Sequence, residues 1–216
     1  MAFEAHIEFL LKTIAQEDST SGGMNRLLDH CASHCPNDVW QGLRQLDIGH
    51  DVGNITAWLG AVLTAEPPPP TIVAFYFGLF DESEDGVQAR CRLYVAGSER
   101  FDAADQSPEW AVDPAYFPEG RYSPSSVLVS LSAAAQGCGS DEARELIEYV
   151  LCLGYASLAV KESRRNLAAN PELNRILRKP VAVGFDSGDV FLLPSDPEAL
   201  GSSSSSRRSK KDDSRC

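Results

Sequence analysis

The chain has 216 residues, of which 43% are hydrophobic and 23% are charged, an ordinary balance for a globular domain. Its net charge of −12 disfavours binding to nucleic acid or to an anionic membrane; it suits a basic protein partner, or it simply keeps the protein in solution. The first residues lack the basic and apolar regions of a signal peptide, and no apolar run approaches the ~20 residues that span a bilayer. We therefore expect a cytoplasmic protein whose six cysteines are free thiols.

Helices are predicted for most of the first 66 residues. Apolar side chains recur at helical spacing over residues 2–17, and residues 19–23 are expected to end that helix. Further helices are predicted at residues 24–35, after a cap at Asn37 or Asp38, and at 51–65 with Asp51 as the N-cap. Four prolines at 67–70 cannot be helical and form a stiff spacer. The spacer divides a helical N-terminal region (1–66) from a core (71–196), and we expect the two to form one fold.

A β-hairpin is predicted between residues 71 and 97, at the centre of the fold. The run TIVAFYFGLF is apolar on both faces, as in a central strand, and is followed by six polar residues or glycines. Residues 87–95 then alternate between apolar and polar side chains, which is typical of a strand with one buried face. The two strands are expected to pair as an antiparallel hairpin.

The rest of the chain is predicted to supply helices and a second hairpin. Residues 98–122 form an ordered loop rich in aromatic residues, and helices follow at about 125–136 and 140–170, with one more short helix from Pro171. Strands are predicted at 181–185 and 190–193, while the serine-rich tail from residue 201 to 216 is expected to be disordered. These elements indicate an α+β fold: a mainly antiparallel sheet of about four strands covered by helices, with a helical N-terminal region.

The run HCASHC at residues 30–35 has the composition of a metal site. On a helix, His30 and His34 share one face and Cys31 and Cys35 share another, and such pairs can supply half of a zinc site. The remaining ligands would have to come from elsewhere in the chain, with His50 and Asp51 the nearest candidates. The alternative is that the cysteines pack as small apolar residues while the histidines face solvent.

No catalytic motif is present in the sequence. The run DESEDG at 81–86 resembles the front of a calcium loop, but Arg92 stands where a bidentate glutamate is required. Nucleophile elbows, phosphate-binding loops and zinc-protease motifs are absent. We therefore nominate no catalytic residue, expect no cofactor, and favour a binding protein over an enzyme.

The most unusual remaining feature is an acidic segment at residues 81–119, which contains ten acids and three bases. Anionic charge with interleaved aromatic anchors suits a surface that captures a basic protein, although the aromatic side chains could instead fold inward. The residues predicted to bind a partner are Asp81, Glu82, Glu84, Asp85, Asp105, Glu109, Trp110, Asp113, Tyr116 and Glu119.

The predicted turn at 186–189 contains two further acids, Asp186 and Asp189. The spacing favours a structural role, because aspartate at the first turn position accepts hydrogen bonds from the turn itself. A second interpretation remains open: two carboxylates near the end of a sheet could bind an arginine or lysine of a partner.

Four short runs carry a family resemblance: FYFGLFD, LYVAGS, WAVDPAYFPEGRY and VAVGFDSGD. Together they resemble a group of small bacterial proteins, some of which are similar to immunity proteins of polymorphic toxin systems. The resemblance spans residues 71–193 and implies a non-enzymatic, acidic, cytoplasmic inhibitor of a bacterial toxin. The rival hypothesis is a metal-binding enzyme or regulator that uses the run at residues 30–35.

Overall fold

The computed structural model describes residues 2–82, 90–102, 108–111, 114–186 and 188–194. Helices α1 (Ala2–Gln16), α2 (Thr20–His34), α3 (Val39–Leu43) and α4 (Ile48–Ala65) precede strands β1 (Ala74–Glu82) and β2 (Arg90–Ser98). Strand β2 is followed by a 3₁₀ turn η1 (Pro108–Ala111) and by α5 (Ser126–Gly137). Next come α6 (Asp141–Glu145), a π-helical segment η2 (Leu146–Leu151), α7 (Cys152–Leu167) and α8 (Pro171–Leu177). The last two strands are β3 (Val181–Phe185) and β4 (Val190–Leu192). The predicted α+β class is confirmed. The predicted tail, residues 201–216, lies outside the described residues.

Two predicted helix boundaries were wrong, and hydrogen bonds explain both. Ser19 does not end the first helix but begins the second, because its Oγ accepts a hydrogen bond from the Gly22 amide. Helix α4 starts at Ile48 with Asp47 as its cap, so Asp51 lies inside the helix, where it is fully buried. Polar residues suited to capping occur at both places, and only the fold determines which of them caps.

The four strands form one sheet in the order β2-β1-β3-β4. The central hairpin is confirmed, since β1 pairs antiparallel with β2, from Ala74 opposite Ser98 to Glu82 opposite Arg90. The second hairpin is also antiparallel, with Gly184 opposite Val190. Between the hairpins β1 and β3 run parallel, so the sheet is mixed but mainly antiparallel. The parallel pair brings the carboxyl ends of β1 and β3 to the same edge of the sheet.

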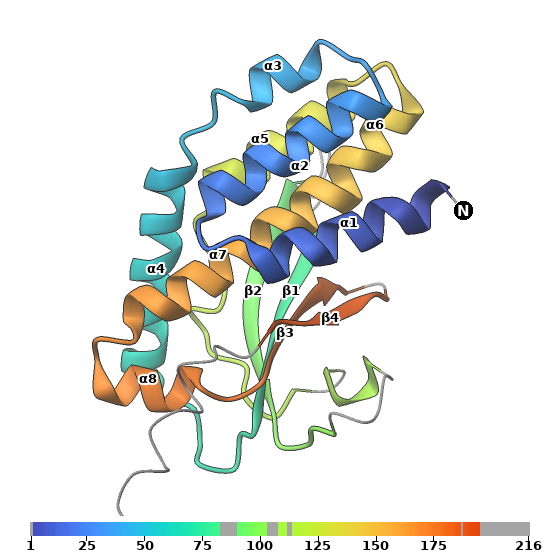
Figure 1. The fold of residues 1–216 in the computed structure, drawn as a ribbon. Helices are drawn as coiled ribbons and strands as arrows, with labels where there is room; N and C mark the ends of the chain where they lie inside the picture. The colour runs from blue at the N-terminus through green and yellow to red at the C-terminus, as the bar shows by residue number, and fades with distance from the viewer. Residues whose placement is uncertain (1, 83–89, 103–107, 112–113, 187, 195–216) are drawn as a thin grey trace, which may run out of the picture.

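Helix α7 packs across the sheet, as its apolar sequence predicts (Figure 1). Alternate residues of β1 and β2 face this helical layer and are buried, among them Phe75, Phe77 and Leu93. The N-terminal helices α2 and α4 contact the other side of α7, so the buried residues of both predicted regions belong to one core. In the described part of the chain, no helix is both long enough and apolar enough to cross a membrane.

Candidate functional site

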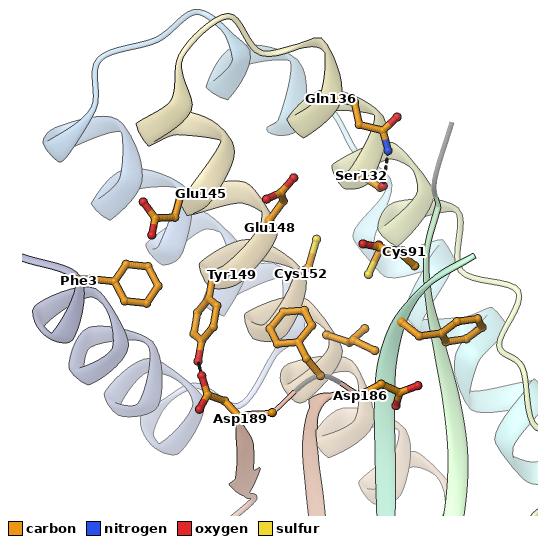
Figure 2. Close-up of a pocket in the computed structure, with 15 residues that line it drawn as sticks. Phe3, Cys91, Ser132, Gln136, Glu145, Glu148, Tyr149, Cys152, Asp186 and Asp189 are labelled. Carbon is orange, nitrogen blue, oxygen red and sulfur yellow. Dashed lines mark hydrogen bonds between the residues drawn. The ribbon is translucent and has the colours of Figure 1, made fainter. Parts of the chain in front are cut away.

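A pocket of about 680 Å³ opens where the parallel strands β1 and β3 end, between the sheet and the start of the α6–α7 helix (Figure 2). In sheets with parallel strands, ligands commonly bind outside the carboxyl ends of those strands. The volume lies within the range of pockets that bind small ligands. The pocket is lined by Phe3, Leu79, Phe80, Asp81, Cys91, Ser132, Gln136, Glu145, Glu148, Tyr149, Cys152, Phe185, Asp186, Gly188 and Asp189.

The lining of this acidic pocket has a strong charge imbalance. Five of its residues carry carboxyl groups, and none of the described lining residues is a lysine, an arginine or a histidine. Glu145 and Glu148 come from the helical wall, whereas Asp186 and Asp189 come from the turn between β3 and β4 (Figure 2). Side chains from distant parts of the chain thus present one sign of charge to one hollow, which favours a cationic ligand.

A local change of helix type helps to form the helical wall. Residues 146–151 are π-helical, and the Cys152 amide donates to the carbonyl of Ile147, five residues earlier. The wider turn includes Glu148 and Tyr149, both of which line the pocket. Single π-helical turns inside α-helices are rare and are frequent at functional sites. The π-helical segment and the acidic lining therefore both indicate a functional site at this pocket.

Two tyrosines hold the aspartates of the β3–β4 turn. The hydroxyl of Tyr149 donates to Asp189, and the hydroxyl of Tyr94 donates to Asp186 Oδ1 over 2.6 Å. Burial raises the pKa of both tyrosines, and the hydrogen bonds to the aspartates raise it further. Both phenols therefore stay protonated at neutral pH and act as fixed donors. The bonds leave the second carboxyl oxygen of each aspartate for a ligand.

The two thiols of the pocket are poorly suited to covalent catalysis. Cys91 and Cys152 are 5% and 2% exposed, and their sulfurs lie near each other across the floor of the pocket (Figure 2). A hydrogen bond with Cys91, together with burial, raises the pKa of the Cys152 thiol well above its ordinary value. A nucleophilic cysteine needs the opposite shift, toward the thiolate. Burial and this shift therefore argue against Cys152 as a nucleophile.

The residues predicted to bind a partner are only partly gathered at this pocket. Asp81 lines it, and Glu82 at the end of β1 pairs with Arg92 at 2.8 Å. Tyr116 is 6% exposed and its hydroxyl donates to the carbonyl of Glu66, so this aromatic side chain folds inward. Trp110 packs edge-on against Phe101, with 5.2 Å between ring centroids.

The other predicted partner-binding residues add little to the site. Glu119 is exposed, and its amide donates to Glu66. Glu84, Asp85, Asp105 and Asp113 lie outside the described residues, as does the side chain of Glu109. The prediction for these positions stays a prediction.

A second site is a cluster of three histidines on α1 and α2. One nitrogen from each of His6, His30 and His34 lies within 4.8 Å of the other two. His6 Nδ1 is 2.9 Å from His30 Nε2, and the His30 ring stacks on Phe9 at 4.0 Å between centroids. His6 is buried, His30 is half-buried and His34 is exposed, so this histidine cluster opens to solvent on one side.

The surroundings of His6 and His30 favour neutral imidazoles at these two positions. Burial, followed by the neighbouring His34 and His6, lowers the pKa of His30 to about 4. Burial and His34 also lower the pKa of His6, while the carboxylates of Glu142 and Glu145 act in the opposite direction. Neutral imidazole is the form that binds metal ions.

The predicted metal ligands are therefore brought together only in part. His30 and His34 share a face, as predicted, but Cys31 and Cys35 are buried in the hydrophobic core and are not in the cluster. Burial raises the pKa of the Cys31 thiol to about 12. Of the two further candidates, His50 lies outside the cluster, and Asp51 instead accepts hydrogen bonds from Ser125, Ser126 and Tyr155. The third histidine is His6, which lies 24 residues before His30, and no local spacing indicates it.

The chain matches no family model, no curated protein and no solved structure. The assignment of a function therefore depends on the chemistry of the two sites.

Proposed function

We propose that this chain is a non-enzymatic acidic binding protein, and that a lysine or arginine of a basic partner protein enters the acidic pocket. The observation that carries the proposal is the pocket itself, which is lined by five acidic residues and, among the described lining residues, by no basic one. The resemblance in residues 71–193 supports a toxin as the partner, with the chain acting as an immunity-type inhibitor in the cytoplasm.

The aromatic lining of the pocket also supports a long cationic side chain as the ligand. Aromatic rings from Phe3, Phe80 and Phe185 line the pocket together with the acids. Such rings can pack against the aliphatic stem of a lysine or arginine and attract its charged end. Aspartates already fixed by tyrosine hydroxyls lose little further freedom on binding, which favours affinity. Net negative charge would speed the encounter with a basic partner.

The proposal is tested with proteins encoded beside this chain's own gene. Each neighbouring product is purified with the full-length chain, and the affinity of any complex is measured at several salt concentrations. We expect one basic neighbour to bind, with an affinity that falls as salt rises, because charge steers the association. The double variant Glu148→Gln, Asp186→Asn should weaken binding by about tenfold or more, since buried charge pairs at interfaces are costly to break.

The matched control is the double variant Glu8→Gln, Glu172→Gln. It removes the same charge at exposed positions that do not line the pocket, on α1 and α8. Binding should change little in this control, because exposed rim charges contribute little to affinity. Equal losses in the two double variants would mean that net charge, and not the pocket, governs binding. Absence of any basic partner among the neighbouring products would contradict the proposal itself.

A further inference from the structure

We propose that His6, His30 and His34 form a binding site for a divalent transition metal ion of the zinc class, separate from the acidic pocket. This inference is independent of the proposed partner protein. It rests on the positions of three imidazoles from two helices, on the exposure of His34 to solvent, and on the hydrogen bond that fixes the tautomer of His34.

The spacing of the three imidazoles is close to that of a metal site. Zinc binds histidine nitrogens at 2.0–2.1 Å, which places two tetrahedral ligands about 3.3 Å apart. The His6 and His30 nitrogens are 2.9 Å apart, and the nitrogens of all three residues lie within 4.8 Å of one another. To reach about 3.3 Å, the His6 and His30 nitrogens must separate by about 0.4 Å, and a pair at the 4.8 Å limit must approach by about 1.5 Å, which side-chain rotation can supply. The hydrogen bond between His6 and His30 would be replaced by two bonds to the ion.

A hydrogen bond to the backbone fixes the tautomer of His34. Its Nδ1 donates to the carbonyl oxygen of His30 over 2.8 Å, so the proton of a neutral ring is on Nδ1 and the lone pair is on Nε2. Histidines that bind metals usually donate their other nitrogen in this way, to a carbonyl or a carboxylate. The stacking of His30 on Phe9 fixes the plane of the second ring.

The ligand set indicates the class of the ion. Imidazole suits zinc, copper, nickel and cobalt, whereas magnesium and calcium prefer oxygen ligands. Three protein ligands leave a fourth position for water, and the exposed side chain of His34 leaves a path for the ion to enter. A bound ion would join α1 to α2. Because Phe3 lies one turn before His6 and lines the acidic pocket, the ion would also hold that wall in place.

The test uses the full-length chain, purified without a histidine tag and stripped of metal with EDTA. Zinc chloride is titrated calorimetrically, and cobalt chloride is titrated while visible absorption is recorded. We expect one equivalent of zinc to bind and the cobalt protein to show the intense absorption of a low-coordinate site. In His34→Gln, zinc affinity should fall at least about tenfold. Substitution of a residue that only hydrogen-bonds a metal ligand can already cause a loss of this size. The intense cobalt bands should also be lost.

His50→Gln is the matched control, because His50 is an exposed histidine on α4 that lies outside the cluster. It should bind zinc and cobalt as the wild-type chain does. The cobalt spectrum reports the ligands of the ion directly. Because His34 is exposed, we expect His34→Gln to keep the fold. The proposal is overturned if the wild-type chain shows no saturable zinc binding. It is also overturned if His34→Gln retains the wild-type affinity and spectrum, or if His50→Gln loses them equally.

Discussion

Asp51 shows how one buried polar residue can join three helices. Its side chain is fully buried in α4, and its carboxyl oxygens accept hydrogen bonds from the Ser125 hydroxyl at 2.6 Å and the Ser126 amide at 2.7 Å. The Ser126 hydroxyl and the Tyr155 hydroxyl donate to the same carboxyl group. Asp51 therefore satisfies donors at the start of α5 and in the middle of α7. Burial of a polar group is tolerated where every hydrogen bond is made.

Replacement of Asp51 should be among the most destabilising single changes in the chain. Asp51→Ala leaves four donors without this acceptor, two of them on the buried residues Ser125 and Tyr155, and we expect a loss of about 3 kcal/mol or more in the free energy of unfolding. Urea unfolding measures this change. Asp47→Ala, which removes only the cap of the same helix, should cost about 1 kcal/mol. Similar losses in the two variants would show that the buried network contributes no more than an ordinary cap.

Charged side chains of α7 contact the ends of three neighbouring helices. Lys161 Nζ donates to the carbonyls of Ile14 and Glu17, at the C-terminal end of α1, over 3.0 and 2.8 Å. Glu162 accepts from the amide and hydroxyl of Thr20, at the N-terminal end of α2. Arg164 donates to the carbonyl of Leu177, at the end of α8. Each charge has the sign that the dipole of the neighbouring helix favours.

Lys161→Met tests whether the contacts of Lys161 with the end of α1 stabilise the fold. The thioether side chain keeps most of the apolar packing but gives the two carbonyls no donor, so we expect a loss of about 2 kcal/mol in the free energy of unfolding. Lys12→Met is the same substitution at an exposed position of α1 and should change stability by less than about 0.5 kcal/mol. Chemical denaturation of both variants gives the comparison. If both leave stability unchanged, the contacts of Lys161 with α1 are not stabilising.

At the scale of the whole molecule, the N-terminal helices and the sheet share one hydrophobic core. Buried residues from Leu10 in α1 to Leu193 after β4 form a continuous cluster, and α7 lies between the two groups of elements. We therefore expect a single cooperative transition on heating or in urea, despite the proline-rich spacer. Far-ultraviolet circular dichroism, dominated by the helices, and tryptophan fluorescence should give the same midpoint. Two separate transitions, or a stable isolated fragment of residues 1–66, would show two independent domains.

Much of the fold could be predicted because the sequence patterns are local. The period of two in residues 87–95 and the apolar run before it determine a hairpin, since a shift by one residue would expose the buried face. Ser125, Ser140 and Asn170 each accept a hydrogen bond from a helix amide, as their side chains allow within a few residues of chain. Helices, strands and their antiparallel pairs follow from such short-range chemistry.

The parallel pairing of β1 with β3 and the composition of both sites were decided only by the tertiary structure. Asp81 and Asp189 are 108 positions apart in the chain and meet in one pocket because β1 and β3 end side by side. His6 lies beside His30 because α1 packs on α2. Cys31 is buried because its face of α2 packs against the hydrophobic core. A sequence pattern records which face of an element is buried. Which two faces meet depends on how all the elements pack together, and that is a property of the whole chain.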